Sequence, residues 1–461
     1  MIEIVFKTYC NLINLIKRVS DAMSGRLKST LFDVSVLVMT FICTIHYFND
    51  RLESLLHSGT NMVFRLSPII FLIILICCIE EKADHEKIKI NKIFWAGWFL
   101  CFITIFVMSF INPVKKLYFL WSLLSLTILP MIMIVLSQSK SYFKWSVKIA
   151  RNVVTISYIF VVMNLAITPF VANDLVGVET IDYNYLGLCV NPNGNGMICT
   201  TFFTAALYLL LVEDREGWWN LVSMGFSAAI VLISGCRTAQ IVMLAELIIA
   251  ASVYKVHSKE HKRKWKASHI AIACILVAML SAALAQALIY LDKMDVNAYA
   301  LSEPELSDYD DTILWVYENE TRIKINDLSS GRLLIWKAYS RNLSLFGKGK
   351  TNAPLMPEVT ASRWAHNNAL DIWYISGVFA FLGYIIWLAA VTAFAFKCLS
   401  TKGQYRKEYL LTILAFAAYF IQAMLEITLY PMSVGFFFML SMALGTAAFK
   451  PQDEQQILTG E

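Results

Sequence analysis

The sequence predicts an all-α polytopic membrane protein with about twelve transmembrane helices. Composition is the first of three observations behind this fold class: 58% of the residues are hydrophobic and 16% are charged, whereas about a quarter of the residues in a soluble domain are charged. The second observation is a series of long apolar runs, and the third is the distribution of lysine and arginine between them.

Twelve apolar runs are candidates for membrane-spanning helices. About 20 apolar residues in a helix cross the hydrocarbon core of a bilayer, and a helix is required because lipid offers no partners for exposed backbone groups. The runs are 31–48, 63–79, 93–111, 117–136, 149–171, 190–212, 217–235, 238–254, 268–290, 370–397, 409–428 and 431–449.

Lysine and arginine predict the orientation of these runs. Segments on one side of the membrane hold 24 of them, whereas the short loops on the other side hold four. The positive-inside rule therefore places both termini in the cytoplasm. The first run follows a basic segment without a small-residue cleavage site, so we interpret it as a retained span. This topology explains the net charge of +5, and we expect no nucleic-acid partner.

The chain divides accordingly into five parts. We expect a cytoplasmic N-terminal segment (1–30), helices one to nine (31–290), a large extracytoplasmic loop (291–368), helices ten to twelve (369–449) and a cytoplasmic tail (450–461). A loop of this length in a compact protein is usually functional or disordered. Its "SSGRLLIW" segment predicts an amphipathic helix capped by Ser329 or Ser330, with an apolar side formed by Leu333, Leu334, Trp336 and Tyr339.

Two arginines are predicted at the outer surface. Arg332 precedes Trp336 by one helical turn, so its guanidinium can stack on the indole while binding an anion. Arg237, in "VLISGCRTAQIVML", follows a sharp turn at Gly235 and lies at the N-terminus of a span, where the helix dipole favours an anion. The alternatives are a solvated arginine on a surface helix and an arginine that snorkels to the interface.

Polar residues also open two spans. "LGLCVNPNGNGMIC" (186–199) contains Asn191, Asn193 and Asn195, which we interpret as lining a polar cavity and binding sugar hydroxyls; a late helix start with an asparagine cap is the alternative. "SRWAHNNALDIWYISG" (362–377) places His366 beside Asn367 and five residues before Asp371. Among the seven histidines, His366 alone lies in an outward polar motif, and it is our candidate catalyst.

Several other site classes are not predicted. The ten cysteines lie mostly in or beside spans, so we expect no disulfide framework, although Cys189 and Cys236 both fall near the outer surface. No metal-spaced histidine pair or phosphate-binding glycine loop occurs, and we expect neither metal nor cofactor. "SDYDD" (307–311) is better explained as a solvated acidic stretch than as a cation site.

"NPNGNG", "SGCRTA", "SSGRLLIW…LFGKG" and "HNNALDIWYISGVFAFLGY", in this order, resemble the signature segments of the O-antigen ligase and O-antigen polymerase superfamily. The resemblance covers roughly residues 185–395, and a cysteine stands where a small hydroxyl residue is commoner in "SGCRT". It implies a GT-C-like fold and a bacterial cytoplasmic-membrane glycosyltransferase with an extracytoplasmic active site. Its donor and acceptor would be glycans linked to undecaprenyl diphosphate. The other partners that the resemblance implies are membrane lipid and a chain-length regulator or a flippase.

The resemblance places the catalytic roles on His366, Arg237 and Arg332. A histidine can take the proton of an acceptor hydroxyl at neutral pH, and arginines stabilise the charge of a departing diphosphate. This chemistry predicts a metal-independent inverting glycosyltransferase, with Asn191, Asn193, Asn195, Trp336, Asn367 and Asp371 as substrate-binding residues. We expect a polymerase of lipid-linked repeat units; a ligase that transfers the glycan to a lipid or protein acceptor is the alternative, and a flippase is the alternative from another class.

Overall fold

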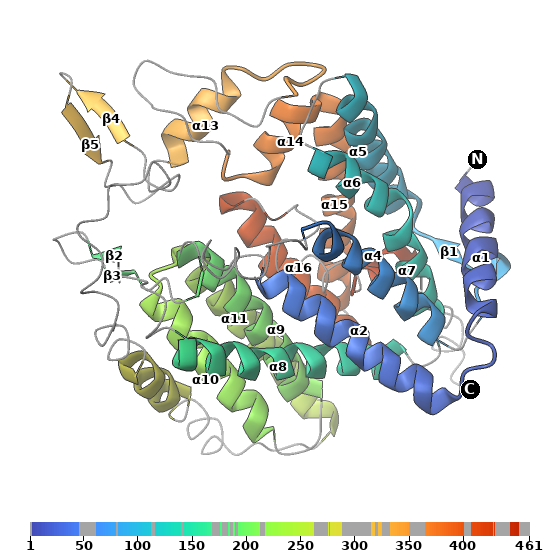
Figure 1. Ribbon diagram of the computed structural model, residues 1–461, viewed down its shortest axis with the longest axis horizontal. Coiled ribbons are helices and arrows are strands. Elements are labelled where there is room, and N and C mark those ends of the chain that lie inside the picture. The colour runs from blue at the N-terminus through green and yellow to red at the C-terminus, as the bar shows by residue number, and fades with distance from the viewer. Residues whose placement is uncertain are drawn as a thin grey trace.

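The computed structural model describes residues 2–45, 61–79, 82–111, 116–139, 142–167, 176–177, 183–184, 188–189, 192–212, 217–261, 275, 277–287, 315–318, 321–324, 332–349, 365–400, 407–426, 428 and 443–450. These residues are mostly helical (Figure 1), and six stretches are long and apolar enough to cross a membrane. The prediction of a helical membrane protein is therefore supported, whereas the number of twelve spans and the sidedness of the loops stay predictions.

Most predicted spans coincide with helices. The first half of the chain contains α1 (Ile2–Arg18), α2 (Gly25–Ile45), α4 (Asn61–Cys78), α5 (Lys92–Ile111), α6 (Lys116–Leu126), α7 (Ile128–Gln138), α8 (Tyr142–Ile167) and α9 (Pro192–Val212). The second half contains α10 (Trp218–Ile233), α11 (Arg237–His261), an apolar helix at Val277–Ala287, α13 (Arg332–Ser340), α14 (Asn368–Ser376), α15 (Val378–Ser400), α16 (Lys407–Leu425) and α18 (Gly445–Ala448). Most of the predicted span 431–449 lies outside the described residues.

Two predicted spans are interrupted. The run 117–136 breaks at Thr127, between α6 and α7. The run 370–397 breaks at Gly377, whose φ of 89° ends α14 before α15 begins. Apolar composition alone does not reveal such breaks, because the helices on both sides of each break are rich in apolar residues. The break at Gly377 separates a short helix beside the polar residues from the helix that spans.

Short strands also modify the all-α prediction. Within the described residues there are three two-stranded antiparallel ladders: β1 (Lys89–Ile90) with β6 (Phe449–Lys450), β2 (Val176–Gly177) with β3 (Tyr183–Asn184), and β4 (Trp315–Glu318) with β5 (Thr321–Lys324). In the last ladder Trp315 pairs with Lys324 and Glu318 with Thr321. This hairpin lies in the large loop, at the opposite end of the molecule from α1 (Figure 1).

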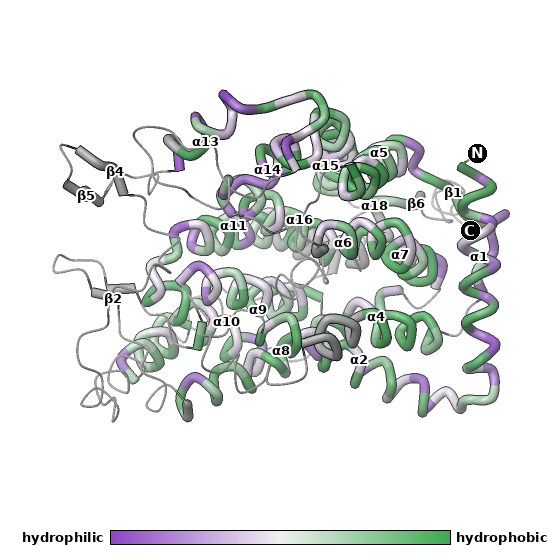
Figure 2. Tube along the Cα trace, turned by 45° about the horizontal axis from the view of Figure 1, so that its top comes forward, coloured by the Kyte–Doolittle hydropathy of each residue, from purple (hydrophilic) through white to green (hydrophobic). Residues whose placement is uncertain are grey.

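Helix α9 occupies the centre of the bundle. It contacts α8, α10, α11 and α16, and 89% of its most apolar stretch is buried. By contrast, the α5 and α15 surfaces that do not face each other expose Ile103, Val107 and Phe379. Figure 2 shows the apolar residues running along the helices of the bundle. The polar N-terminus of α9 is thereby held in the interior, beside α16.

Candidate functional site

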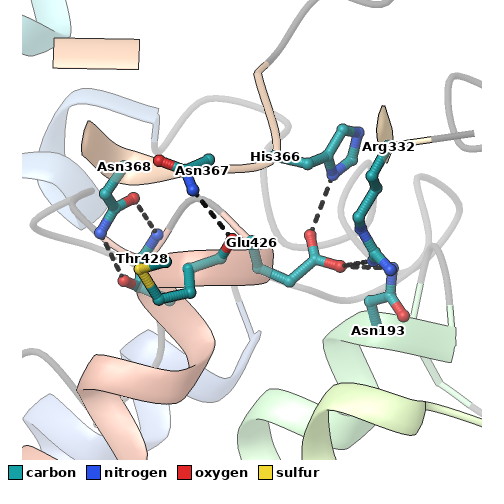
Figure 3. Close-up of polar contacts among 8 residues, drawn as sticks. Asn193, Arg332, His366, Asn367, Asn368, Glu426 and Thr428 are labelled. Atoms are coloured by element: carbon teal, nitrogen blue, oxygen red, sulfur yellow. Dashed lines mark hydrogen bonds and ion pairs between the residues drawn. The ribbon is translucent and has the colours of Figure 1, made fainter. Parts of the chain in front are cut away.

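One carboxylate, that of Glu426, joins three of the residues singled out in the sequence. Its Oε2 lies 3.1 Å from Nδ1 of His366, and its Oε1 accepts a hydrogen bond of 3.0 Å from Nδ2 of Asn193. Arg332 forms an ion pair with the same Oε1. Figure 3 shows these side chains converging from α9, α13, the end of α16 and the turn that precedes α14.

This cluster is largely shielded from solvent. The side chain of Glu426 is 7% exposed, that of Arg332 15% and that of His366 16%. Burial by itself would raise the pKa of the Glu426 carboxyl, but the hydrogen bond and charge of His366 and the Arg332 guanidinium outweigh it and lower the pKa. Because its pKa is lowered, Glu426 is an anion at neutral pH. It directly follows Leu425, the last residue of α16.

His366 has an unusual backbone conformation. Its φ of 46° is the one positive value among the non-glycine residues that the structure describes. Such a conformation costs free energy and persists where the surroundings enforce it, often at functional sites. The turn directs the imidazole toward Glu426, and none of the described residues forms a hydrogen bond or ion pair with its Nε2 atom.

The two asparagines after His366 fix that turn. Asn367 caps α14, because its Oδ1 accepts the backbone N–H of Leu370 at 3.1 Å, and its Nδ2 donates to the Met424 carbonyl at 3.0 Å. Asn368 bonds Thr428 twice, through Nδ2 to the hydroxyl at 2.8 Å and through Oδ1 to the backbone N–H at 2.9 Å. The "HNN" motif thus ties the start of α14 to the end of α16 (Figure 3).

Arg332 begins α13, and this helix is held by α14. The buried side of α13 consists of Ile335, Ala338 and Tyr339, whereas Leu333 is 61% exposed. Leu333 is therefore not part of the side that packs on α14, and its place on the predicted apolar side stays a prediction. Tyr339 packs edge-on against Tyr374 of α14, with ring centroids 4.7 Å apart.

The "LFGKG" segment after α13 docks on the break between α14 and α15. Gly347 has a φ of 74°, and a Cβ there would lie 2.3 Å from the carbonyl oxygen of Ile375. The backbone N–H groups of Lys348 and Gly349 donate to the carbonyls of Tyr374 and Ile375 at 2.7 and 3.1 Å. These bonds attach the segment that follows α13 to the end of α14, so Arg332 and His366 lie close together although thirty-three residues separate them in sequence.

The predicted sharp turn before Arg237 is confirmed. Helix α10 ends at Ile233, Gly235 has a φ of 64° and α11 begins at Arg237. Cys236 lies under the first turn of α9, where a Cβ on Gly196 would come within 2.5 Å of its Sγ. Burial raises the pKa of the Cys236 thiol to about 12, and the charges of Glu426 and Arg332 act on it as well. The turn therefore adjoins the cluster, while the Arg237 side chain is exposed.

Asp371 is buried one turn into α14. Its Oδ2 accepts a 2.9 Å hydrogen bond from the hydroxyl of Tyr118, which lies on α6. Burial raises the pKa of the Asp371 carboxyl to about 7, against the opposing effects of the Tyr118 hydrogen bond and the His366 charge. Asp371 thus links α14 to α6, and its carboxylate is not among the groups that contact Glu426.

The remaining predicted residues differ in where they lie. Asn195 is completely buried in α9, and Asn191 lies outside the described residues. The segment from Pro192 on is regular helix rather than irregular backbone. In the described part of the chain Arg332 contacts Glu426 and does not stack on Trp336. Cys189 and Cys236 are free thiols, as expected.

Glu426, which joins the cluster, was not among the predicted site residues. It is the sole charged residue between positions 409 and 449 of the sequence. An ionisable side chain within an apolar run is costly and usually functional, so this isolation was a signal that could have identified it.

Comparison with known proteins adds no further assignment, since no protein-family model, curated protein or solved structure matches the chain. The site therefore has to be interpreted from its chemistry. It combines an imidazole whose Nε2 has no hydrogen bond from the described residues, a carboxylate and a guanidinium. A base oriented by a carboxylate is an arrangement that removes a proton from a hydroxyl group.

Proposed function

We propose that this protein is a glycosyltransferase that polymerises undecaprenyl-diphosphate-linked oligosaccharide repeat units on the outer face of the bacterial cytoplasmic membrane. The observation that carries the proposal is the convergence of His366, Arg332 and Asn193 on Glu426. These three residues come from separate motifs of the superfamily that the sequence resembles. Their meeting in space is what a shared active site requires.

His366 serves as the general base. Its Nδ1 faces Glu426, so an Nδ1–H donated to the carboxylate leaves Nε2 as the proton acceptor. The acceptor sugar hydroxyl loses its proton to Nε2 as its oxygen bonds to the anomeric carbon of the donor. The bond from that carbon to the phosphate oxygen breaks, and undecaprenyl diphosphate leaves with the electron pair. Displacement from the opposite side inverts the anomeric configuration.

Arg332 and Arg237 stabilise the departing diphosphate. The ion pair with Glu426 uses one terminal nitrogen of the Arg332 guanidinium, and a guanidinium carries five N–H donors in all. The others are available to phosphate oxygens, which arginine binds through its planar fork. Arg237 begins α11 beside the cluster, where the helix N-terminus adds positive potential.

A membrane assay with lipid-linked repeat units tests the proposal. The wild-type protein should convert them into a ladder of longer lipid-linked chains, and His366→Ala should abolish the ladder. His85→Ala is the matched control, because His85 is exposed in a 3-10 helix (His85–Lys87) remote from the site. Transfer of one glycan to a different acceptor would identify a ligase instead. Movement of the donor across the membrane without a change in its length would identify a flippase.

A further inference from the structure

Helix α1 presents three different faces along its length. One face is buried and contains Phe6, Cys10, Ile13 and Lys17. A second is polar and exposed, and it carries Lys7, Asn11 and Arg18. The third is apolar and exposed: Ile4 is 70% exposed, Leu12 41% and Leu15 57%. A helix in contact with water on two sides has no reason to place three large apolar side chains on one of them.

The buried face of α1 is firmly attached to the rest of the protein. Asn14 exchanges two hydrogen bonds with the backbone of Ala83, at 2.8 and 3.0 Å. The Ser20 hydroxyl donates to the Cys77 carbonyl at 2.9 Å, and Phe6 packs edge-on against Trp95 with centroids 4.9 Å apart. The direction in which the exposed apolar stripe points is therefore fixed by the fold.

The orientation of α1 differs from that of α8, one of the candidate membrane spans. In both views α1 runs along one end of the molecule, across the direction of α8 (Figures 1 and 2). It is not among the six helices with the length and composition of a membrane span, whereas α2, which follows it, is. A helix that lies across spanning helices at their ends lies in the plane of the membrane surface.

We propose that α1 is an interfacial helix whose apolar stripe enters the boundary between headgroups and acyl chains of an anionic lipid surface. Residues 2–29 contain five basic and two acidic side chains, so this end of the protein is positively charged. Lys7 and Arg18 flank the apolar stripe and are exposed, which suits contact with lipid phosphates. An apolar stripe beside cationic side chains is the pattern by which helices bind anionic membrane surfaces.

Spin labels on neighbouring residues of the full-length protein test the position of this helix. A nitroxide is attached at Leu12→Cys, and Asn11→Cys, on the polar face, is the matched control. The protein is reconstituted in nanodiscs, and collisions with oxygen, which enters lipid, are compared with collisions with a water-soluble nickel chelate. The unsubstituted protein, in which Cys77 and Cys398 are half-buried, gives the background signal.

The label at Leu12 should favour oxygen and the label at Asn11 should favour the nickel chelate. Equal access of the chelate to both labels would overturn the proposal. Protection of the Leu12 label from both probes would also overturn it, since a second copy of the chain would then cover the stripe.

The charge of the lipid is tested with the same label. The depth of the Leu12 label should increase when phosphatidylglycerol is added to phosphatidylcholine nanodiscs, because anionic headgroups attract Lys7 and Arg18. The variant Lys7→Gln/Arg18→Gln should lose this increase. An unchanged depth in both lipids would show that the headgroup charge plays no part, and would overturn the proposed preference for an anionic surface.

Discussion

Nδ1 of His366 lies 3.1 Å from Oε2 of Glu426, a residue sixty positions further along the chain. The carboxylate of Glu426 also contacts Arg332 and Asn193, so it is the group that the other three side chains share. A group that orients a catalytic base affects the rate without itself contacting the reacting atoms. Substitutions at Glu426 and at its partners should therefore affect the reaction rate and the stability of the protein differently.

Glu426→Gln should reduce polymerisation by about 10²-fold or more, because a proton-transfer catalyst loses its orientation and its balancing charge. His366→Ala should reduce it by a similar or larger factor. The double variant should be no slower than His366→Ala alone, since the two residues act as a unit. Initial rates with lipid-linked repeat units measure all three. Multiplicative losses in the double variant would show that Glu426 acts independently of His366.

Arg332→Ala should destabilise the protein as well as inactivate it. It removes a cation from a buried carboxylate, which costs about 3–5 kcal/mol when both groups are fully buried. We expect about 2 kcal/mol, because His366 and Asn193 remain and the arginine side chain is partly exposed. Thermal unfolding in detergent measures the loss.

Arg332→Ala combined with Glu426→Gln should recover much of the lost stability without recovering activity. The neutral amide no longer needs a counter-charge in the buried site. A double variant as unstable as Arg332→Ala would show that the arginine stabilises the protein through contacts other than the ion pair.

Alanine at Gly347 or Gly377 should destabilise the docking of the loop on α14. Both glycines have positive φ values, 74° and 89°, and a Cβ at either would lie 2.3 Å from a backbone oxygen. Backbone strain alone costs about 1–3 kcal/mol. Gly217→Ala is the matched control, since its φ is −85° and a Cβ there meets the nearest atom at 3.2 Å. Equal unfolding temperatures for Gly347→Ala and Gly217→Ala would contradict this expectation.

Asp371 should make the stability of the protein depend on pH. Its folded pKa of about 7 lies above the usual unfolded value of about 3.9. The protonated carboxyl therefore contributes stability that is fully present below about pH 4, decreases as the pH rises and is lost above about pH 7. Asp371→Asn should flatten this part of the profile and be more stable than the wild type at pH 8. Unfolding temperatures across this range measure the effect, and an unchanged slope would contradict it.

Much of the fold could be predicted from hydropathy, because long apolar runs have few alternatives in a membrane protein. The turn at Gly235 was predicted for the same reason, since two spans leave only a few residues between them. The breaks at Thr127 and Gly377 could not be predicted in this way. They depend on which backbone groups find partners elsewhere, as the Val378 N–H does at the Leu345 carbonyl.

The site was predicted in part. Asn193 was singled out because it is polar within a predicted span. Arg332 was singled out one helical turn before Trp336 in the large loop, and His366 in the polar motif at the end of that loop. Glu426 was missed because it follows a run of ordinary apolar residues without a motif around it. The substrate-binding roles of Asn367 and Asp371 stay predictions, and their hydrogen bonds to Met424 and Tyr118 could not be anticipated from the sequence. The sequence identifies the polar residues, but it does not show which partners the folded chain brings to them.

Because the "LFGKG" segment docks on α14, the relative positions of Arg332 and His366 do not depend on the number of residues between Gly349 and Ala365. The chain leaves the docked segment at Gly349, whose N–H bonds the Ile375 carbonyl, and it returns at Ala365, which is completely buried. Since both ends are anchored to α14, residues between them can be added or removed without shifting Arg332 relative to His366. Each doubling of the length of a flexible connection raises the entropic cost of closing it by only about 0.6 kcal/mol. Under the proposed function, a change in the length of this stretch would accommodate a different glycan while the contact between His366 and Glu426 is retained.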